Sequence, residues 1–416
     1  MRVAAVAGTA LTVVLFLHGV PGIGLPSIGW DAQYRVDLDV YRLGALAWLA
    51  GDPLYDPGFP VTELGEVLPF VYPPIAAVLF VPLTWLPMPA AASLLSVVSA
   101  AVLVAVTAAL VRALGHRVRG WWLAAATPLV LLTDPVRLVL LLGQVNLLLV
   151  GLVWAGLLGR GRWRGVAVGI AAAVKLTPLV FVVWFLLVGD RRAAATAAGT
   201  VGVLTGLGVL AAPADSLEYW SSTVIGLGDG TGTVLDLAYA GNQSLRAVVE
   251  RWGLPDGATS WSWATAAGAA GIGALLLARR CVRAREPLLG AGVLAVAGLL
   301  VSPISWSHHW VWALPVLPVL AEFAVRHGSR APWWVLGAGV VPFAVGPHWL
   351  LPHDDGRERA WSVVEQVVGA HLPLWGATVL VVVGGCLWAP AARPMSPDRG
   401  DGRRPRATTT DPGAAP

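Results

Sequence analysis

The chain has 416 residues, of which 56% are hydrophobic and only 12% are charged. An ordinary globular protein carries about twice that share of charge, so the composition excludes a soluble enzyme. The net charge of +4 comes from short arginine clusters between apolar runs, which indicates membrane topology and not a nucleic-acid-binding face. The two cysteines, Cys281 and Cys386, are too few for a disulfide framework or an iron–sulfur site.

Apolar runs of about membrane-spanning length follow one another through most of the chain. The first follows Arg2, as in a signal peptide, but no clear small-residue cleavage site comes after it, and we interpret it as a retained anchor. We expect an all-α polytopic membrane protein with roughly 11–13 transmembrane helices. The predicted runs are 3–20, 73–87, 89–111, 121–133, 138–158, 165–189, 193–212, 261–278, 287–304, 308–325, 331–351 and 371–390.

Arginine content sorts the loops, because short arginine-rich loops stay on the cytoplasmic side of a membrane. The longer segments 21–72 and 213–260 carry acidic residues and few arginines, so we expect both to be extracytoplasmic loops. We divide the chain into a membrane domain, 1–392, and a disordered cytoplasmic tail, 393–416, which lacks apolar periodicity. The clusters assigned to the cytoplasmic side are 112–119, 160–164, 191–192, 279–285 and 326–330.

Two apolar runs do not fit a simple crossing. Between the outer loop 21–72 and the inner cluster 112–119 the chain must cross an odd number of times, yet two runs intervene. Since 73–87 begins with a Pro-Pro pair, we expect it to be re-entrant or interfacial. The run 165–189 joins two inner clusters and is therefore predicted to be a hairpin with an outward tip at Lys175, the only lysine of the chain. At the tip of a hairpin, the lysine charge does not lie at the hydrocarbon midplane, where a charged side chain is costly.

Two aspartates precede a predicted surface helix in the first outer loop. Apolar residues recur at helical spacing from Leu43 to Ala50, which predicts a short helix lying on the membrane. Asp37 and Asp39 stand just ahead of it. Each is either a helix cap that accepts backbone hydrogen bonds or a general base whose proton affinity is raised by partial desolvation.

The segment 302–310 joins two apolar runs at a predicted outward turn and contains His308 and His309. Adjacent residues do not share a helical face, so at most one of the histidines points into a given pocket. The pair either contacts a phosphate or a sugar, or is solvated within an interfacial aromatic belt around Trp306. We expect no metal site, because no third ligand stands at a suitable spacing.

Basic, amide and tyrosine side chains gather on the same predicted side of the membrane. Lys175 and Arg246 are candidates to pair with a lipid phosphate, and Lys175 alternatively snorkels and neutralises a loop acid. The amides either bind sugar hydroxyls or form interhelical hydrogen bonds and helix caps. The tyrosines either stack on sugars or belong to an ordinary interfacial aromatic belt. The candidate sugar- or acceptor-binding residues are Tyr41, Tyr55, Tyr72, Gln144, Asn146, Asn242, Gln243 and Trp306.

The order of these motifs resembles glycosyltransferase family 87, the actinobacterial polyprenyl-phosphate-mannose-dependent α-1,2-mannosyltransferases of GT-C fold. The resemblance covers about two thirds of the chain, from Asp37 to His309. Its motifs are Asp37-Leu38-Asp39-Val40-Tyr41, Gly51-Asp52-Pro53-Leu54-Tyr55-Asp56, Tyr72-Pro73-Pro74, Gly143-Gln144-Val145-Asn146, Lys175-Leu176-Thr177-Pro178, Gly241-Asn242-Gln243-Ser244 and Ser302-Pro303-Ile304-Ser305-Trp306-Ser307-His308-His309.

The resemblance implies an extracytoplasmic transferase that takes mannose from a polyprenyl monophosphate and passes it to a glycolipid or glycan. The family's catalytic acid corresponds to Asp37, and Asp39 fills a variable position of the same motif. The family's histidine, which faces the donor phosphate, corresponds to His308 or His309. Inversion at the anomeric carbon then needs one base, by analogy with inverting glycosidases. Basic side chains can stabilise the departing phosphate, so we expect neither a metal nor a cofactor.

Two other functions remain open at this point. A related enzyme that transfers arabinofuranose or another pentose from the same lipid carrier would share the fold and the base. A secondary transporter or lipid flippase would also be polytopic, but transporters place charges near the bilayer midplane and are built from repeated halves. The polar motifs here fall on one predicted side and we find no internal repeat.

Overall fold

The computed structural model describes residues 34–56, 59, 61–63, 65, 67–229 and 236–388, and residues 3, 6–8, 10 and 11 of the N-terminal segment. The predicted anchor 3–20 therefore lies mostly outside the described residues, and the predicted tail 393–416 lies entirely outside them.

Helices make up the described part of the chain, which confirms the all-α prediction. Extended pairing occurs there only as two isolated bridges, Val61 with Val67 and Asn242 with Trp306. The α-helices are α2 (Val36–Ala50), α3 (Pro74–Thr84), α4 (Met88–Ala113), α5 (Gly120–Leu131), α6 (Asp134–Leu142), α7 (Asn146–Leu158), α8 (Trp163–Val174), α9 (Val180–Leu187), α10 (Arg191–Ala211), α11 (Pro213–Glu218), α12 (Val224–Asp229), α13 (Leu245–Arg251), α14 (Asp256–Arg283), α15 (Pro287–Val301), α16 (Val316–His327), α17 (Ala331–Val345), α18 (Val363–Gly369) and α19 (His371–Trp388). Short 3-10 or π turns are η2 (Thr177–Leu179), η3 (Tyr219–Thr223), η4 (Ser307–Ala313), η5 (Pro347–Leu350) and η6 (Arg357–Ala360).

Four of the described helices, α4, α10, α14 and α19, are long and apolar enough to cross a membrane. The pair α5 and α6 is a fifth candidate span, bent by 71° at the break between them. Most of the other predicted runs form shorter apolar helices of 10–17 residues, below the roughly 20 residues of a straight span. The protein is therefore an integral membrane protein whose apolar segments are interrupted at several points.

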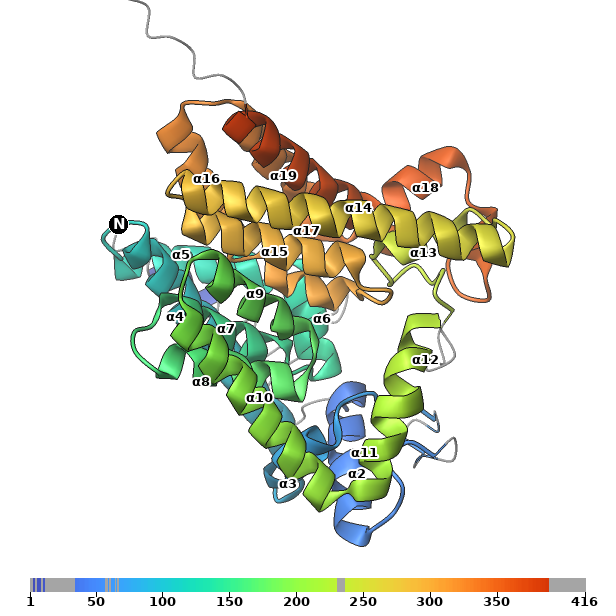
Figure 1. The fold of residues 1–416 in the computed structure, drawn as a ribbon. Helices are drawn as coiled ribbons and strands as arrows, with labels where there is room; N and C mark the ends of the chain where they lie inside the picture. Colours follow the sequence, from blue (N-terminus) through green and yellow to red (C-terminus); the bar gives the residue numbers. More distant parts are fainter. Residues whose placement is uncertain are drawn as a thin grey trace, which may run out of the picture.

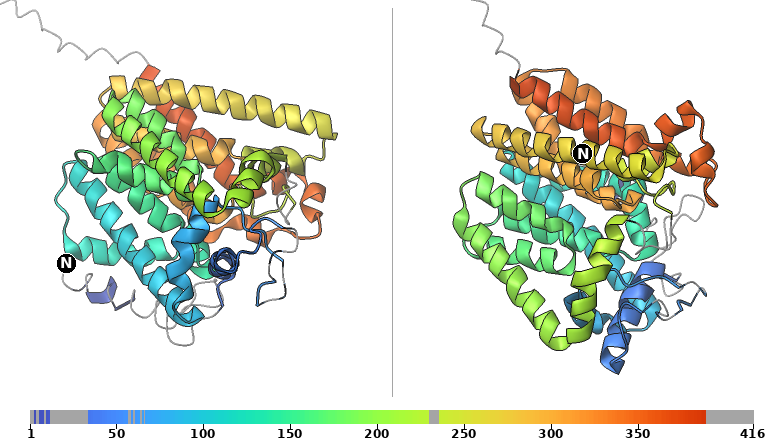
Figure 2. Two further views of the ribbon diagram at one scale, coloured as in Figure 1. Left: turned by 60° about the horizontal axis from the view of Figure 1, so that its bottom comes forward. Right: turned by 45° about the vertical axis from the view of Figure 1, so that its right-hand side comes forward.

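The helices divide into two groups in space. Figure 1 and the right-hand view of Figure 2 place α14 to α19 on one side and α2 to α10 on the other. Within the second group α10 packs along α8, α7 along α4 and α8, and α2 along α3. The groups meet where α15 contacts α9 and where η4 contacts α6 and α7. Polar residues from both groups converge at this second contact.

The predicted hairpin around Lys175 is confirmed by the contact between its two ends. Arg164 in the first turn of α8 forms an ion pair with Asp190, which follows α9. Lys175 lies between the helices in an extended conformation, with φ −147° and ψ 130°. The helix therefore stops at Lys175 and resumes at η2, where Pro178 suits an early position in a new helix.

The segment 73–87 contains the short helix α3, and its placement as an interfacial or re-entrant piece stays a prediction. Pro73 and Pro74 begin it and Pro82 interrupts it near its end. Arg42 of α2 donates hydrogen bonds to the carbonyls of Leu83 and Leu86, which satisfies backbone acceptors at the end of α3. Helix α2 thus holds the C-terminal end of α3.

Two predicted continuous runs are wrong because glycine or proline breaks them. The run 138–158 is divided at Gly143, whose φ of 74° ends α6, so that α7 begins only at Asn146. A Cβ on Gly143 would lie 2.7 Å from the Cβ of Leu38, so only glycine permits this approach to α2. The run 308–325 is likewise divided at Pro315 into η4 and α16.

Candidate active site

Asp37 lies in the first turn of α2 and faces the break between α6 and α7. The side-chain amide of Gln144 donates a hydrogen bond of 2.7 Å to its carboxylate. Arg35, the cap residue of α2, makes no side-chain cap hydrogen bond. The close approach at Gly143 brings these two segments together, although more than 100 residues separate them in the sequence.

Gln144 is fixed in one orientation by its own neighbours. Its amide oxygen accepts hydrogen bonds from the Tyr41 hydroxyl at 2.8 Å and from the Asn146 side chain at 3.1 Å. Because the oxygen is engaged twice, the amide nitrogen is the atom that faces Asp37. Tyr41 also contacts the Tyr72 hydroxyl at 2.9 Å.

Lys175 continues this network toward η4. Its ammonium donates to the Asn146 side-chain oxygen at 3.1 Å and lies 3.0 Å from Nε2 of His309. It also lies over the ring of Tyr72, 5.6 Å from the centroid. One chain of contacts therefore runs from Asp37 through Gln144, Asn146 and Lys175 to His309, and we call these five residues the polar chain.

Burial is the largest influence on the pKa values of the carboxylate and the ammonium in the polar chain. Burial raises the pKa of Asp37 to about 6, although the Gln144 hydrogen bond and the positive charge of Lys175 oppose the rise. Burial lowers the pKa of Lys175 to about 8, and the charge of Asp37 opposes that fall. Near neutral pH a carboxylate that can accept a proton thus stands close to an ammonium that can bind an anion.

The histidines of η4 are neutral in this setting. Burial, followed by the charge of Lys175, places the pKa of both His308 and His309 well below its ordinary value. An ammonium has only donors, so Nε2 of His309 accepts from Lys175 and its proton resides on Nδ1. His308 packs edge-on against His309, and its buried Nε2 has no hydrogen-bond partner in the described part of the chain.

Asp39 is directed away from the polar chain. Its carboxylate accepts hydrogen bonds from the Tyr34 hydroxyl at 2.6 Å and from the backbone of Glu63 at 3.3 Å. These contacts hold the loop that follows α2. Asp39 therefore has a local structural environment, whereas Asp37 faces the other candidate residues.

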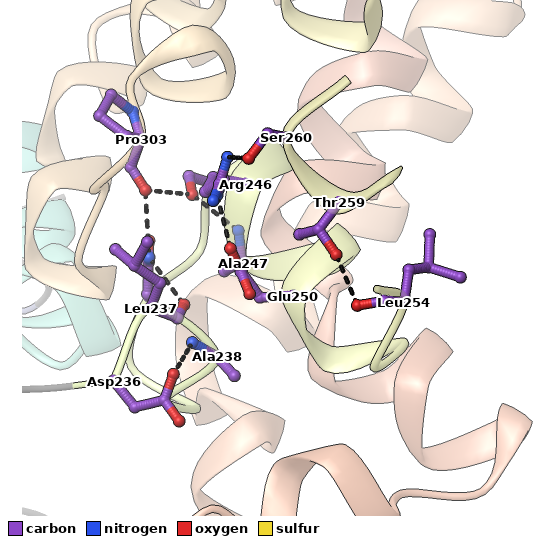
Figure 3. A network of polar contacts seen from close by, with 12 residues as sticks. Asp236, Leu237, Ala238, Arg246, Ala247, Glu250, Leu254, Thr259, Ser260 and Pro303 are labelled. Carbon is purple, nitrogen blue, oxygen red and sulfur yellow. Dashed lines mark hydrogen bonds and ion pairs between the residues drawn. The ribbon is translucent and has the colours of Figure 1, made fainter. Parts of the chain in front are cut away.

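Arg246 contacts residues of α13 and α14, and its pairing with a lipid phosphate stays a prediction. It forms an ion pair with Glu250 of its own helix α13 at 2.6 Å and lies over the ring of Trp263. Figure 3 shows Arg246 between Glu250 and Ser260.

Asn242 and Gln243 bind backbone and hold η4 in place. Asn242 donates to the carbonyls of Leu237 and Pro303 and accepts from the backbone of Ser305. Gln243 donates to the carbonyls of Ala240 and Gly369. Both side chains are fully buried, and they fix the segment that leads into the histidines.

The remaining candidates lie around the polar chain in supporting positions. The Tyr55 hydroxyl donates to the carbonyl of Tyr72 at 2.7 Å, which fixes the residue whose ring lies under Lys175. Trp306 is half-buried and packs edge-on against Tyr239, at 6.2 Å between ring centroids. Trp306 therefore packs against the loop before α13.

A narrow cleft opens beside the polar chain. Lys175 and His309 form its polar end. Its walls are apolar, with Phe181 from α9, Leu299 from α15 and Trp312 from η4. Sequence analysis did not identify this cleft, because its walls come from apolar runs that carry no distinguishing motif.

Arg251 is a second feature that the sequence did not reveal. It is 1% exposed and donates hydrogen bonds to the carbonyls of Ala238, Tyr239 and Asn242 in the loop before α13. It also donates to the carbonyl of Gly369. The only signal in the sequence is its position one turn after Ala247, on the face of α13 that carries the small buried residues.

Comparison with known proteins gives the family. The profile of glycosyltransferase family 87 matches residues 70–303, which is more than half of the chain. The chain belongs to glycosyltransferase family 87. The match includes the Gln144–Asn146 break and Lys175, whereas Asp37 precedes it and the histidines of η4 follow it.

Named relatives extend the similarity over most of the chain. A polyprenol-phosphate-mannose-dependent α-(1-2)-phosphatidylinositol mannoside mannosyltransferase of Mycobacterium tuberculosis is 36% identical, over 87% of this chain and 88% of its own length. Its counterpart in Mycolicibacterium smegmatis is 37% identical over 89% of the chain and 88% of its own length. A phosphatidylinositol pentamannoside mannosyltransferase of Mycobacterium tuberculosis is 35% identical over 79% and 75%. No solved structure matches the chain.

Proposed function

We propose that this glycosyltransferase moves mannose from a polyprenyl-phosphate donor to a hydroxyl of a phosphatidylinositol mannoside, at the extracytoplasmic face of the membrane. The observation that carries the proposal is the polar chain, which joins an anionic Asp37 to a cationic Lys175 beside an apolar cleft. The names of the relatives supply the donor and acceptor classes.

The apolar cleft suits the lipid part of such a donor. A polyprenyl phosphate ends in a phosphomonoester that carries the sugar, and its isoprene units are apolar. With the phosphate between Lys175 and the histidines, the first isoprene units would lie along Phe181, Leu299 and Trp312. Lys175 supplies positive charge to the phosphate, and the unpartnered Nε2 of His308 is a further group that can turn toward it.

Asp37 is the proposed general base. It takes the proton of the acceptor hydroxyl as that oxygen attacks the anomeric carbon, and the bond from this carbon to the phosphate oxygen breaks. The lipid phosphate leaves with the bonding electrons and is stabilised by Lys175. One displacement converts a β-linked donor into an α-linked product, so one base is sufficient.

The decisive experiment replaces the base in full-length protein. Asp37→Asn should fold, insert and bind donor, but lose transfer of radiolabelled mannose to phosphatidylinositol mannoside by a factor of about 10²–10⁴. Asp52→Asn, which changes an exposed carboxylate in the same loop, is the matched control and should retain activity. Full transfer by Asp37→Asn would exclude Asp37 as the base.

The same assay separates the donors. We expect label from polyprenyl-phosphate mannose in the product and none from the arabinofuranosyl analogue. Transfer of the pentose alone would replace mannose in the proposal while retaining the mechanism.

A further inference from the structure

Three aromatic residues form a cluster beside η4, outside the polar chain. The ring of Tyr239 lies 6.2 Å from that of Trp306 and 6.1 Å from that of Trp349, both edge-on. All three residues are half-buried. His353 adds a fourth ring, 5.7 Å from Trp349. We call Tyr239, Trp306 and Trp349 the aromatic cluster.

Charged residues lie directly against the aromatic cluster. The indole nitrogen of Trp349 donates to Oδ1 of Asp134 at 3.1 Å, and Arg137 lies 3.4 Å from the same oxygen. Asp134 is only 2% exposed, and its other oxygen, Oδ2, has no hydrogen-bond partner among the residues that the structure describes. A buried carboxylate oxygen of this kind ordinarily has a donor, so the site has capacity for one.

Two glycines permit this arrangement. A Cβ on Gly241 would lie 2.9 Å from the ring of Tyr239 and 3.0 Å from that of Trp349, which is too close for either ring to stay in place. Gly346 has a φ of 64°, and its Cβ would lie 2.6 Å from the carboxylate carbon of Asp134. The rings and the carboxylate therefore meet only because both positions lack a side chain.

Half-buried aromatic residues next to charged hydrogen-bonding groups are the chemistry of sugar recognition. A pyranose ring has an apolar C–H face that packs on aromatic rings, and its hydroxyls bond to carboxylate and guanidinium groups. Trp306 precedes His309 by three residues on the same segment, so a sugar on the aromatic cluster would lie next to the polar chain. The apolar cleft for the donor lipid contacts the other side of η4, through His309 and Trp312.

We propose that the aromatic cluster, with Asp134 and Arg137, binds sugar rings of the acceptor glycolipid and presents its hydroxyl to Asp37. This inference rests on the proposed function, because it names the subsite for the acceptor of that reaction. Asp134, Arg137 and Tyr239 of this subsite lie within the matched family segment, whereas Trp306 and Trp349 lie beyond residue 303.

The test compares Michaelis constants for the two substrates in full-length protein. Trp349→Ala and Tyr239→Ala should each raise KM for phosphatidylinositol mannoside about three- to tenfold, the loss expected for one stacked ring. KM for polyprenyl-phosphate mannose should stay within about twofold of the original value. Trp333→Ala, which removes an exposed indole at the opposite end of α17, is the control and should alter neither constant.

Several outcomes distinguish the possibilities. If Trp349→Ala does not elute as a folded protein, Trp306→Ala and Tyr239→Ala carry the same expectation. An unchanged acceptor KM in folded variants, or an equal rise in donor KM, overturns the acceptor subsite. Such a result would overturn only the acceptor subsite and would not bear on Asp37 as the base. Full activity of Asp37→Asn would instead overturn the proposed function, independently of the KM values of the aromatic variants.

Discussion

Asp37 and Asp39 stand two positions apart on α2, and helix geometry sends their side chains about 200° apart around its axis. Asp37 meets Gln144 of the break between α6 and α7, whereas Asp39 meets Tyr34 and the backbone of Glu63. The environment of each carboxylate is therefore decided by which neighbour the helix turns toward it. This difference supports Asp37 as the base in the proposed reaction.

Gln144 is expected to keep Asp37 ionised, which a pH profile can measure. The Gln144 hydrogen bond lowers the pKa of Asp37 against the larger effect of burial, and the resulting value is about 6. Gln144→Ala removes that hydrogen bond, so the pKa should rise. A base works only when deprotonated, so the acid limb of kcat/KM against pH should move to higher pH in this variant.

The control for this prediction is Gln366→Ala, which removes another buried amide, one that donates to the backbone of Arg251 and Glu358. It should leave the acid limb in place even if it lowers stability. An acid limb that stays fixed in Gln144→Ala, or that moves equally in both variants, would show that Gln144 does not tune the base.

Sequence reasoning at this scale identified groups that cannot be explained by local helix chemistry. The single lysine in an apolar run and the histidine pair at a turn both pointed to the polar chain. The pairing of Arg246 with Glu250 could also be predicted, because opposite charges four residues apart pair on a helix. Asn242 and Gln243 could not be assigned, because an amide that binds backbone and one that binds sugar have the same residue type.

The elements that form the site are helices interrupted at polar residues. Gly143 ends α6, Lys175 separates α8 from α9, and Pro315 divides η4 from α16. Each interruption leaves backbone without helical partners, and such backbone is tolerated at membrane depth only where protein or a water-filled cavity surrounds it. The prediction of the hairpin succeeded because charge sidedness constrains it, whereas the break at Gly143 depends on a close approach to α2 that no local pattern shows.

The orientation of the hairpin can be tested by thiol labelling. Thr177, exposed just after the tip, should become reactive toward an impermeant maleimide added to intact cells when it is replaced by cysteine. Arg162→Cys, at the base of the hairpin and also exposed, should react only after the membrane is opened. Both changes belong in a Cys386→Ser background, since the other native thiol, Cys281, is buried. The reverse pattern would place the site on the cytoplasmic side.

At the scale of the whole molecule, the site joins segments from both helix groups. Asp37, Gln144 and Lys175 come from the group of α2 to α10, and His309 belongs to the segment after α15. Family resemblance at the level of motifs anticipated this convergence. The segment 346–369 was not anticipated in any role, because its contributions are backbone carbonyls, indole rings and glycines that carry no chemical signature in the sequence.

Arg251 is the buried link between the loop before α13 and the C-terminal segment. Arg251→Ala would remove the side-chain donor of the Ala238 and Asn242 carbonyls and one of the donors of the Tyr239 and Gly369 carbonyls, and we expect a loss of about 3–5 kcal/mol in unfolding free energy. Thermal unfolding in detergent measures this as a lower midpoint. Arg359→Ala removes a half-exposed ion pair with Asp236 nearby and should cost no more than about 1 kcal/mol. Equal midpoints for the two variants would contradict the prediction.

The solitary lysine has a practical consequence for enzymology. An amine-directed reagent meets one side chain in this polypeptide, and that side chain is the proposed phosphate ligand at the mouth of the cleft. With a pKa of about 8, Lys175 is partly unprotonated in mildly alkaline buffer, the form that acylating agents require. Occupancy of the cleft by donor lipid can therefore be followed as protection of a single lysine side chain, read on the peptide that contains Lys175, without any engineered probe.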